Sequence, residues 1–378
     1  MHVVYNGWFW DQPNTGSGQY LRHLLHHLRR VAPALKMTLV LPPGLASADD
    51  LPADINVMTT KGSRSNVGKV WFEQRSFPQM SGRCGADIAH VPYWGSPLSS
   101  PIPVVTSILD VIPLALPQYS PGVRGRLYTS LVSAAARGSS QIITISNTAK
   151  ADIVQYLGLP EASITTTYLA ADEAYHPRIG AERDAAVREK YNLPDQFVLY
   201  LNGFDIRKRL ADALLAFTYV GPVHGGEIPL VIGGREPQWG TPMFPDMREY
   251  AEKLQITEYV RWIGYVDDAD KPALYRLADV YVNPTIYEGF GLPVLEAMAS
   301  GTPVVARDIP VMQEIAGDAA YLVKDARTMG GALIALLIQE PLRQSQIARG
   351  LAQVTNYSWR KTARETLAVY EKVMSAED

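Results

Sequence analysis

Two glutamates, Glu288 and Glu296, enclose a glycine-rich segment that reads EGFGLPVLE. Glycine lets backbone N–H groups approach an anion closely, and a helix that begins near Pro293 would direct its positive end to the same place. We therefore expect the backbone of Gly289, Phe290, Gly291 and Leu292 to hold phosphate oxygens. Each carboxylate could then accept hydrogen bonds from the hydroxyls of a sugar or a ribose beside the phosphates. A tight turn before an amphipathic helix with solvated glutamates is the structural alternative.

The elements around this segment follow an α/β pattern, in which short apolar β-branched runs alternate with helical periodicity. Such alternation is typical of parallel sheets with crossover helices. The predicted strands are 2–8, 36–42, 87–93, 103–110, 140–146, 197–203, 228–234, 259–265, 279–284 and 302–307. The predicted helices are 19–31, 211–220, 247–255, 271–278 and 292–300.

The strand pattern breaks once, in the segment DEAYHPRIGAERDAA, and this break predicts two domains. We place the boundary at about Arg178, so that the domains are residues 1–178 and 179–358. Residues 359–378 are predicted to form a final amphipathic helix, because apolar side chains recur there at helical spacing. These side chains are Trp359, Ala363, Leu367 and Tyr370.

The stretch EGFGLPVLEAMASGTPVVA closely resembles the E-x7-E motif of a large family of retaining glycosyltransferases that includes sucrose synthase and bacterial mannosyltransferases. The likeness continues upstream as far as Val260 and downstream through PVMQEIAGDAAYLV. A weaker likeness runs further back, to about Asp87, and on to the final helix. Residues 46–83 show no likeness. The resemblance implies the GT-B fold, in which two Rossmann-like domains face each other across a cleft and the final helix returns to the first domain.

The resemblance also assigns roles to the two glutamates and to a neighbouring loop. It implies that Glu296 binds the ribose hydroxyls and that Glu288 lies near the transferred sugar, where a carboxylate can stabilise developing positive charge. Gly264, Tyr265 and Val266 resemble the loop whose main chain contacts the nucleotide base. Main-chain contacts do not reveal which base is bound.

Lys208 lies between a predicted strand and a predicted helix, where a cation can reach an anion at the carboxyl end of a sheet. A solvated residue at the helix start is the alternative. The resemblance implies that Lys208 pairs with the donor diphosphate. Many family members carry an arginine directly after the strand glycine, where this chain has Phe204, and Arg207 or Arg209 would have to replace it.

Four residues of the first domain, Asn14, Gly16, Ser17 and Gly18, are predicted to form a turn between a strand and a helix. Their N–H groups could face a phosphate, although a purely structural turn explains the residues equally well. The position resembles the glycine loop of the family, in which the backbone amides approach the donor phosphates. We therefore include Gly16 and Gly18 in the predicted diphosphate site.

The clearest departure from the family lies in VVTSILDVIPL, where the family usually has His-Asp and this chain has Leu109 before Asp110. The resemblance implies that this histidine lies beside the sugar, often near its 6-hydroxyl. Because leucine cannot form a hydrogen bond, we hypothesise that the donor sugar lacks a 6-hydroxyl or that another polar group replaces the histidine. His90 resembles a second histidine of the family, and a histidine satisfied within the core is the alternative. Asp110 and His90 are the predicted assistants of catalysis.

Composition limits the other functions that this chain could have. The sequence has 378 residues, 47% apolar content, a net charge of −3 and a single cysteine, Cys84. These values predict two ordinary cores, no intrachain disulfide, no cysteine-based metal cluster and a reducing compartment, with the cytoplasm as the default. Neither a secretory signal nor a membrane-spanning run is apparent.

Charge is divided unevenly, since residues 1–178 carry 14 Lys and Arg against 11 Asp and Glu, and residues 179–378 carry 21 against 27. The two halves therefore have net charges of +3 and −6. Basic residues gather between Arg22 and Lys36 and between Lys61 and Arg75. They predict either a solvated face or a peripheral contact with an anionic membrane or acceptor. Nucleic acid is an unexpected partner for an acidic chain without a recognition motif.

The predicted reaction transfers a sugar from a nucleotide-diphosphate donor to a hydroxyl of a glycan or glycolipid acceptor, with retention of configuration. GDP-mannose, a UDP-sugar and a 6-deoxy-sugar nucleotide are the candidate donors. The resemblance implies that the enzyme needs no cofactor and no metal. An epimerase on the same fold and a non-catalytic nucleotide-sugar binder are the alternatives. An NAD-dependent oxidoreductase fits poorly, because NTGSGQ does not give the G-x-G-x-x-G pattern.

Overall fold

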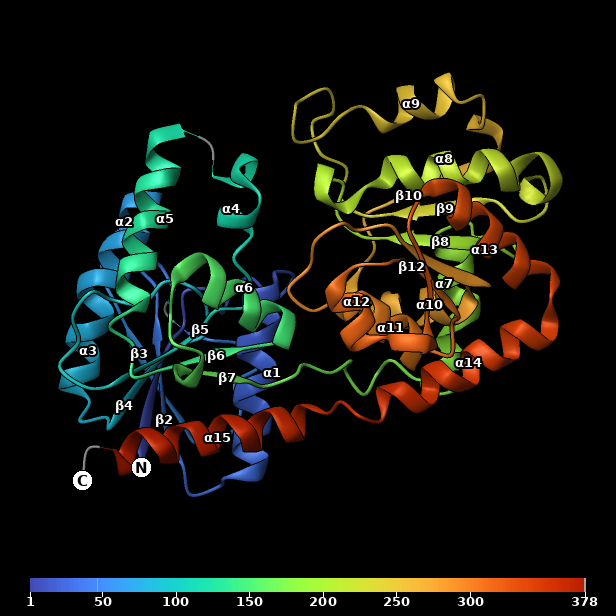
Figure 1. The fold of residues 1–378 in the computed structure, drawn as a ribbon. Coiled ribbons are helices and arrows are strands. Elements are labelled where there is room, and N and C mark those ends of the chain that lie inside the picture. The colour runs from blue at the N-terminus through green and yellow to red at the C-terminus, as the bar shows by residue number, and fades with distance from the viewer. Residues whose placement is uncertain (46, 121, 377–378) are drawn as a thin grey trace. The chain divides into compact units, whose positions relative to one another are not determined.

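The structure is a computed structural model that describes residues 1–45, 47–120 and 122–376, and these residues form two α/β units (Figure 1). The first unit comprises Met1–Leu169 together with Ser358–Asp378, and the second comprises Ala170–Tyr357. The chain therefore passes from the first unit to the second at Ala170, eight residues before the Arg178 that the sequence suggested.

The first unit contains a parallel sheet of seven strands in the order β3-β2-β1-β4-β5-β6-β7. The strands are β1 His2–Asn6, β2 Lys36–Leu41, β3 Ile55–Thr59, β4 Ile88–Val91, β5 Val104–Ser107, β6 Gln141–Thr144 and β7 Ile164–Thr166. The helices are α1 Gly16–Val31, α2 Asn66–Trp71, α3 Phe77–Arg83, α4 Ile112–Ala115, α5 Gly122–Ala136, α6 Asn147–Leu157 and α15 Trp359–Ser375. A π-helical turn, Phe72–Ser76, joins α2 to α3.

The second unit repeats this plan with six parallel strands in the order β10-β9-β8-β11-β12-β13. The strands are β8 Val198–Leu201, β9 Leu230–Gly233, β10 Val260–Gly264, β11 Val280–Asn283, β12 Val304–Arg307 and β13 Tyr321–Val323. The helices are α7 Asp184–Lys190, α8 Leu210–Val220, α9 Met247–Lys253, α10 Lys271–Leu277, α11 Leu292–Ala299, α12 Pro310–Ile315, α13 Ala326–Ile338 and α14 Glu340–Val354.

The central strands of both sheets are buried along their length, which explains why the sequence shows them as nearly continuous apolar runs. All four residues of β4, β5, β8, β9 and β11 are buried. Helices cover the faces of each sheet, as Figure 1 shows for α8 and α13 of the second unit, which pack against each other. In both sheets the strand order reverses beside the first strand of the unit, and open α/β sheets bind ligands at this point.

Three strands escaped prediction, and all three lie at a sheet edge. β3 is largely exposed, β7 and β13 have only three residues each, and each of the three pairs with a single neighbouring strand. Short or polar edge strands carry too little apolar periodicity to stand out in a sequence. The first helix also begins earlier than predicted, at Gly16, because the Thr15 side chain accepts a hydrogen bond from the Gly18 N–H and caps it.

The final helix, α15, belongs to the first unit and lies beside α1 (Figure 1). The Trp359 indole stacks on the His23 ring with 4.6 Å between ring centroids, and the Tyr370 hydroxyl lies 2.6 Å from His90 Nδ1. The predicted return of this helix to the first domain is confirmed.

Every helix in the described part of the chain is too short or too polar to cross a membrane.

Candidate functional site

The candidate site lies at the carboxyl edge of the second sheet, where the strand order reverses between β8 and β11. These two strands are paired neighbours, with Leu199 opposite Tyr281. Both are followed by loops that leave the sheet at the same edge. The loops touch through their backbones, since the Ile286 N–H donates to the Arg207 carbonyl over 3.0 Å. Residues about 80 positions apart in the sequence thereby become neighbours.

Two cations and one carboxylate meet where these loops join. Lys208 Nζ donates to Glu288 Oε1, and Arg207 Nη1 donates to Glu288 Oε2 over 3.0 Å. Arg207 Nη1 also donates to the Tyr287 carbonyl over 2.8 Å. Arg207 and Lys208 belong to a short 3₁₀ turn, Ile206–Lys208, and the Asp205 side chain caps this turn by accepting the Arg207 N–H over 3.2 Å. The structure therefore brings together Arg207, Lys208 and Glu288, as a shared site requires.

This cluster of Arg207, Lys208 and Glu288 is largely removed from water. Lys208 is 9% exposed, and burial lowers its pKa while the Glu288 carboxylate opposes that change. Charges in such a place interact more strongly than charges in water, and each needs a partner. A diphosphate bound here could accept hydrogen bonds from Arg207 and Lys208, which the Glu288 carboxylate already orients.

The glycine turn after Glu288 leads directly into α11. Gly291 has a φ of 100°, a conformation that side chains with a Cβ rarely adopt, and an added Cβ would lie 2.6 Å from Met312 Cε. The next residue, Leu292, opens α11, and Pro293 lies in its first turn as predicted. Phe290 is buried against the Tyr357 ring, so only its backbone could contact a ligand. The predicted combination of bare turn and helix N-terminus is present.

Glu296 lies one turn further along α11 and is 8% exposed. Its Oε2 accepts a hydrogen bond from the Tyr275 hydroxyl over 3.3 Å, and the Tyr175 hydroxyl also bonds to this carboxyl group. Burial raises the pKa of Glu296 to about 7, against the opposing effects of Lys271 and the two tyrosines. Glu296 thus differs from Glu288, since it is held by neutral hydroxyls and not by cations.

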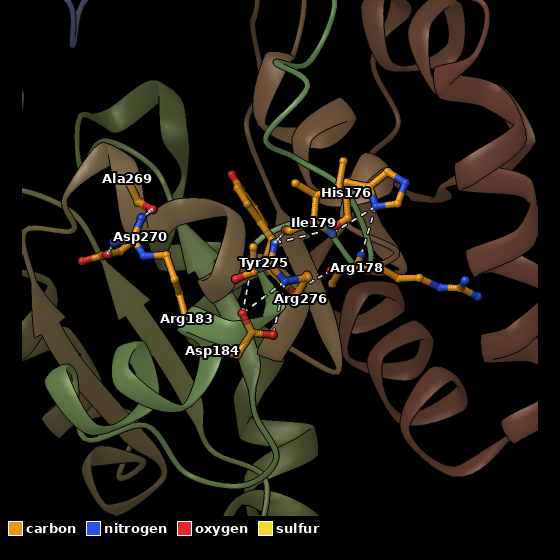
Figure 2. A network of polar contacts seen from close by, with 11 residues as sticks. His176, Arg178, Ile179, Arg183, Asp184, Ala269, Asp270, Tyr275 and Arg276 are labelled. Atoms are coloured by element: carbon orange, nitrogen blue, oxygen red, sulfur yellow. Dashed lines mark hydrogen bonds and ion pairs between the residues drawn. The ribbon is translucent and has the colours of Figure 1, made fainter.

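Arg276, which follows Tyr275 on α10, takes part in a network of polar contacts (Figure 2). Arg276 Nη2 lies 2.5 Å from Asp184 Oδ1, and its guanidinium also donates to the carbonyl groups of Ile179 and Gly180. Arg183 reaches Asp270 from the same segment over 2.9 Å. The sequence did not reveal this network, because no local pattern links residues 176–184 to a helix about 90 positions later.

The loop predicted to contact the base follows β10. Gly264 has a φ of 71°, and its carbonyl accepts the Gly234 N–H over 2.8 Å. The Val266 side chain is buried. The Tyr265 ring is partly exposed and lies under the Arg235 guanidinium, whose carbon is 5.1 Å from the ring centroid. Of the predicted pair Tyr265 and Val266, only Tyr265 presents a side chain to solvent.

Phe204 occupies a core position and not a phosphate position. Its ring is buried among Tyr200, Trp239 and Trp262, with centroid separations between 5.4 and 6.2 Å. Arg209 bonds to Asp212 over 2.9 Å, and Asp212 is also bound by Arg307. Arg207 is therefore the arginine that the structure places beside Lys208.

Two of the glycines predicted for the diphosphate site, Gly16 and Gly18, lie in the first unit. Gly16 and Gly18 are the first and third residues of α1, so the prediction that they lie in a turn before this helix was wrong. A Cβ on Gly18 would lie 2.0 Å from the Gln12 carbonyl oxygen, whereas a Cβ on Gly16 would meet nothing within 4 Å. Close packing therefore explains why residue 18 is a glycine, whereas nothing in the structure explains a glycine at residue 16.

The predicted assistants of catalysis also belong to the first unit. His90 is fully buried, its Nε2 lies 2.8 Å from Ser107 Oγ, and burial lowers its pKa to about 3. These contacts favour the alternative of a satisfied core histidine. Asp110 Oδ1 accepts the Ile112 N–H over 3.0 Å at the start of α4, and Leu109 beside it is half-buried.

Two family models together match most of this chain. The description "Glycosyltransferase Family 4" matches residues 14–175, and "Glycosyl transferases group 1" matches residues 183–353. The chain is 31% identical over 270 residues to O-antigen chain mannosyltransferase B of Escherichia coli, a match that spans 71% of this chain and 70% of that protein.

Two further similarities extend this finding. The chain is 40% identical over 126 residues to phosphatidyl-myo-inositol mannosyltransferase of Mycobacterium leprae, which is 32% of this chain and 34% of that protein. Sucrose-phosphate synthase from Thermosynechococcus elongatus has a similar fold, with a TM-score of 0.76 and 18% sequence identity over the whole of both chains.

Proposed function

We propose a specific sugar-transfer reaction for this chain, which belongs to the group 1 glycosyltransferases of family 4 and has their GT-B fold. It moves a sugar from a nucleotide-diphosphate donor to a hydroxyl of a polysaccharide or glycolipid precursor, and the anomeric configuration is retained. The cluster of Arg207, Lys208 and Glu288 carries the proposal, because it joins two oriented cations and a carboxylate at the reversal point of the second sheet.

Different residues of the second unit are proposed to contact different parts of the donor. Arg207 and Lys208 bind the diphosphate together with the turn from Gly289 to Leu292 and the positive end of α11. Glu296 accepts hydrogen bonds from the ribose, and the loop of Tyr265 and Val266 receives the base. Glu288 faces the transferred sugar. Gly16 of the first unit is proposed to approach the donor phosphates through its backbone amide, whereas the Gly18 N–H is already donated to Thr15 Oγ1 and serves the start of α1.

In the reaction the bond between the anomeric carbon and the phosphate oxygen breaks, and a bond to the acceptor oxygen forms on the same face. The acceptor proton passes to the departing phosphate. Lys208 and Arg207 stabilise the negative charge on the leaving diphosphate, and the Glu288 carboxylate stabilises the positive charge that develops on the sugar. Asp110 assists from the first unit, while buried His90 is the weaker candidate. The proposed reaction requires neither a cofactor nor a metal ion.

GDP-mannose is the first donor to test, because both curated relatives described above are mannosyltransferases by name. UDP-sugars and 6-deoxy-sugar nucleotides follow. Leu109 bears on this choice, since it offers no hydrogen bond to a 6-hydroxyl. A Leu109→His variant that gains activity with a hexose donor supports the 6-deoxy hypothesis, and an unchanged donor preference argues against it.

The direct experiment has two stages. A panel of GDP-, UDP- and dTDP-sugars is first screened by thermal shift, where a ligand at a hundredfold its Kd should stabilise the fold by about 2.7 kcal/mol. The stabilising donor is then incubated with lipid-linked glycan acceptors, and the products are analysed by mass spectrometry and by NMR of the new anomeric centre. A product of inverted configuration, or no product with any stabilising donor, would overturn the proposal.

The same product analysis separates the two alternatives. An epimerase would convert the donor sugar without an acceptor, and a non-catalytic binder would leave the donor intact.

Within the cell we propose a cytoplasmic location, with a peripheral contact between the first unit and the inner face of the membrane, where lipid-linked acceptors would be available.

A further inference from the structure

Two arginines of the second unit lie over aromatic rings, and only one of them has a carboxylate partner. The Arg248 guanidinium carbon is 4.6 Å from the centroid of a Trp262 ring, and the Arg235 guanidinium carbon is 5.1 Å from the centroid of the Tyr265 ring. Arg248 also donates to Glu236 through Nε over 3.1 Å and through Nη2 over 2.6 Å. This ion pair accounts for the place of Arg248 in the structure.

Arg235 has no such explanation. Its side chain is exposed, as is the Tyr265 ring beneath it, which has 42% of its surface open to solvent. Within the part of the chain that the structure describes, the Arg235 guanidinium forms neither an ion pair nor a hydrogen bond. A guanidinium carries five N–H donors in one plane and no acceptor. Arg235 therefore offers an oriented set of donors to a ligand.

The backbone holds Arg235 beside the loop that follows β10. Arg235 follows β9, and β9 and β10 are parallel neighbours. The loops after these strands are joined, because the Gly234 N–H donates to the Gly264 carbonyl over 2.8 Å. Gly234 has a φ of 151°, and an added Cβ there would lie 2.5 Å from the Asn202 carbonyl oxygen. A glycine is thus required directly before Arg235 to bring the two loops together.

The nucleobases differ in what they present to such a group. Guanine carries two acceptors, O6 and N7, side by side on one edge, whereas adenine has an amino donor in place of O6. Uracil has one carbonyl acceptor on the corresponding edge and no N7. An arginine can donate to O6 and N7 of guanine at the same time, and this bidentate contact adds geometric specificity to affinity.

We infer that Arg235 selects guanine as the base of the donor. Two N–H groups of its guanidinium donate to O6 and N7, and the Tyr265 ring keeps the guanidinium in one orientation. The donor class is therefore a GDP-sugar. This inference rests on the proposed function, because it assumes that the loop of Tyr265 and Val266 receives the base. It concerns the choice among bases, which main-chain contacts alone do not explain.

The test measures binding of four nucleoside diphosphates to the full chain by isothermal titration calorimetry. GDP and inosine diphosphate share O6 and N7, whereas ADP and UDP lack this pair. The wild type should bind the first two on the order of tenfold or more tightly than the last two. Arg235→Met keeps the aliphatic stem and removes the donors. It should weaken GDP and inosine diphosphate on the order of tenfold or more, and change ADP and UDP by less than about twofold.

Two further variants separate the planar fork from its charge and from its unit. Arg235→Lys keeps the positive charge without the fork, so it should bind GDP as weakly as Arg235→Met does. Arg261→Met is the matched control, since Arg261 is an exposed arginine at the second position of β10. It should bind all four nucleotides as the wild type does. Thermal unfolding should show that every variant is folded.

Several results would overturn the inference. One is a wild type that binds UDP or ADP as tightly as GDP. Another is an Arg235→Met variant that weakens GDP and UDP equally, or an Arg235→Lys variant that restores GDP binding, since either would show that Arg235 only attracts the diphosphate charge. These results leave the proposed transfer reaction standing. A chain that binds none of the four nucleotides would overturn both.

Discussion

The two units share a strand order, yet their reversal points differ in chemistry. In the second unit that point is lined by Arg207, Lys208 and Glu288. In the first unit it lies between β1 and β4, where the Asn6 side chain accepts the Trp8 N–H over 3.0 Å and the Tyr93 hydroxyl over 3.3 Å. The same topology thus supports a charged cluster in one sheet and a buried, uncharged arrangement of Asn6 and Tyr93 in the other. Topology indicates where a ligand could bind, and the side chains decide whether the place can bind an anion.

The largest effect should follow from Glu288→Gln, because it removes the carboxylate proposed to stabilise charge on the transferred sugar. We expect the kcat for sugar transfer to fall on the order of 10²–10³-fold, with a smaller change in donor KM. The measurement is steady-state kinetics with the donor found by thermal shift.

The matched control for this change is Glu236→Gln. Glu236 is also an ion-paired carboxylate of the second unit, bound to Arg248 over 2.6 Å, but it is not part of the cluster. Its substitution should leave kcat nearly unchanged. Equal losses in the two variants would show that the reversal point of the second sheet has no special role.

A second change, Lys208→Met, keeps the aliphatic stem and removes the cation. Hydrogen bonds to charged groups contribute about 1.5–3 kcal/mol, so the Kd of the nucleoside diphosphate should rise about 10- to 100-fold. Isothermal titration calorimetry measures this directly. Lys253→Met, which removes an exposed lysine paired with Glu249, is the control and should not change the Kd. Unaltered affinity in Lys208→Met would contradict its assignment to the diphosphate.

Glu296 provides a pH-dependent comparison. Burial raises its pKa from 4.5 to about 7, so between these values the folded chain keeps a proton that the unfolded chain loses. The contribution of Glu296 to stability should therefore fall as pH rises from about 4.5 to 7 and then level off. Glu296→Gln removes this dependence and should raise the free energy of unfolding at about pH 8 by up to ~3 kcal/mol.

Donor binding should respond to pH in the opposite sense. If the ionised Glu296 carboxylate accepts the ribose hydroxyls, the wild type should bind the donor more tightly as pH rises through about 7. Glu296→Gln should lose this pH response and bind more weakly at high pH. Chemical denaturation and calorimetric titration across this range provide the two measurements. A wild type whose donor affinity is flat with pH would remove Glu296 from the ribose site.

The smallest effect on activity is expected for His90→Gln in the first unit. Its loss of contacts with Ser107 and Tyr370 should lower the free energy of unfolding by about 1–2 kcal/mol, while kcat/KM stays within about twofold. Urea unfolding and steady-state kinetics are measured on the same preparation. A collapse of kcat with unchanged stability would restore His90 to the catalytic residues and narrow the difference between the units.

The local features of the site were predictable from sequence, whereas its assembly was not. The start of α11 at Leu292 was confirmed because Pro293 and the glycine turn are local signals. The contacts of Glu288 with Arg207 and Lys208 depend on the pairing of β8 with β11, which no local pattern specifies. Sequence likewise suggested one role for Gly16 and Gly18, and the structure separates them, because only Gly18 is enclosed by backbone.

Tyr275 and Arg276 are adjacent residues of α10 that serve different neighbours. One side chain touches Glu296, and the other holds the backbone at Ile179 and Gly180. Movement of residues 176–184 would therefore shift Arg276 and, through the adjoining Tyr275, would reach Glu296, the carboxylate that is proposed to bind the ribose. If Glu296 binds the ribose as proposed, Arg276 and its partners would affect donor affinity without touching the donor, and a variant screen confined to the proposed donor-binding residues would overlook them.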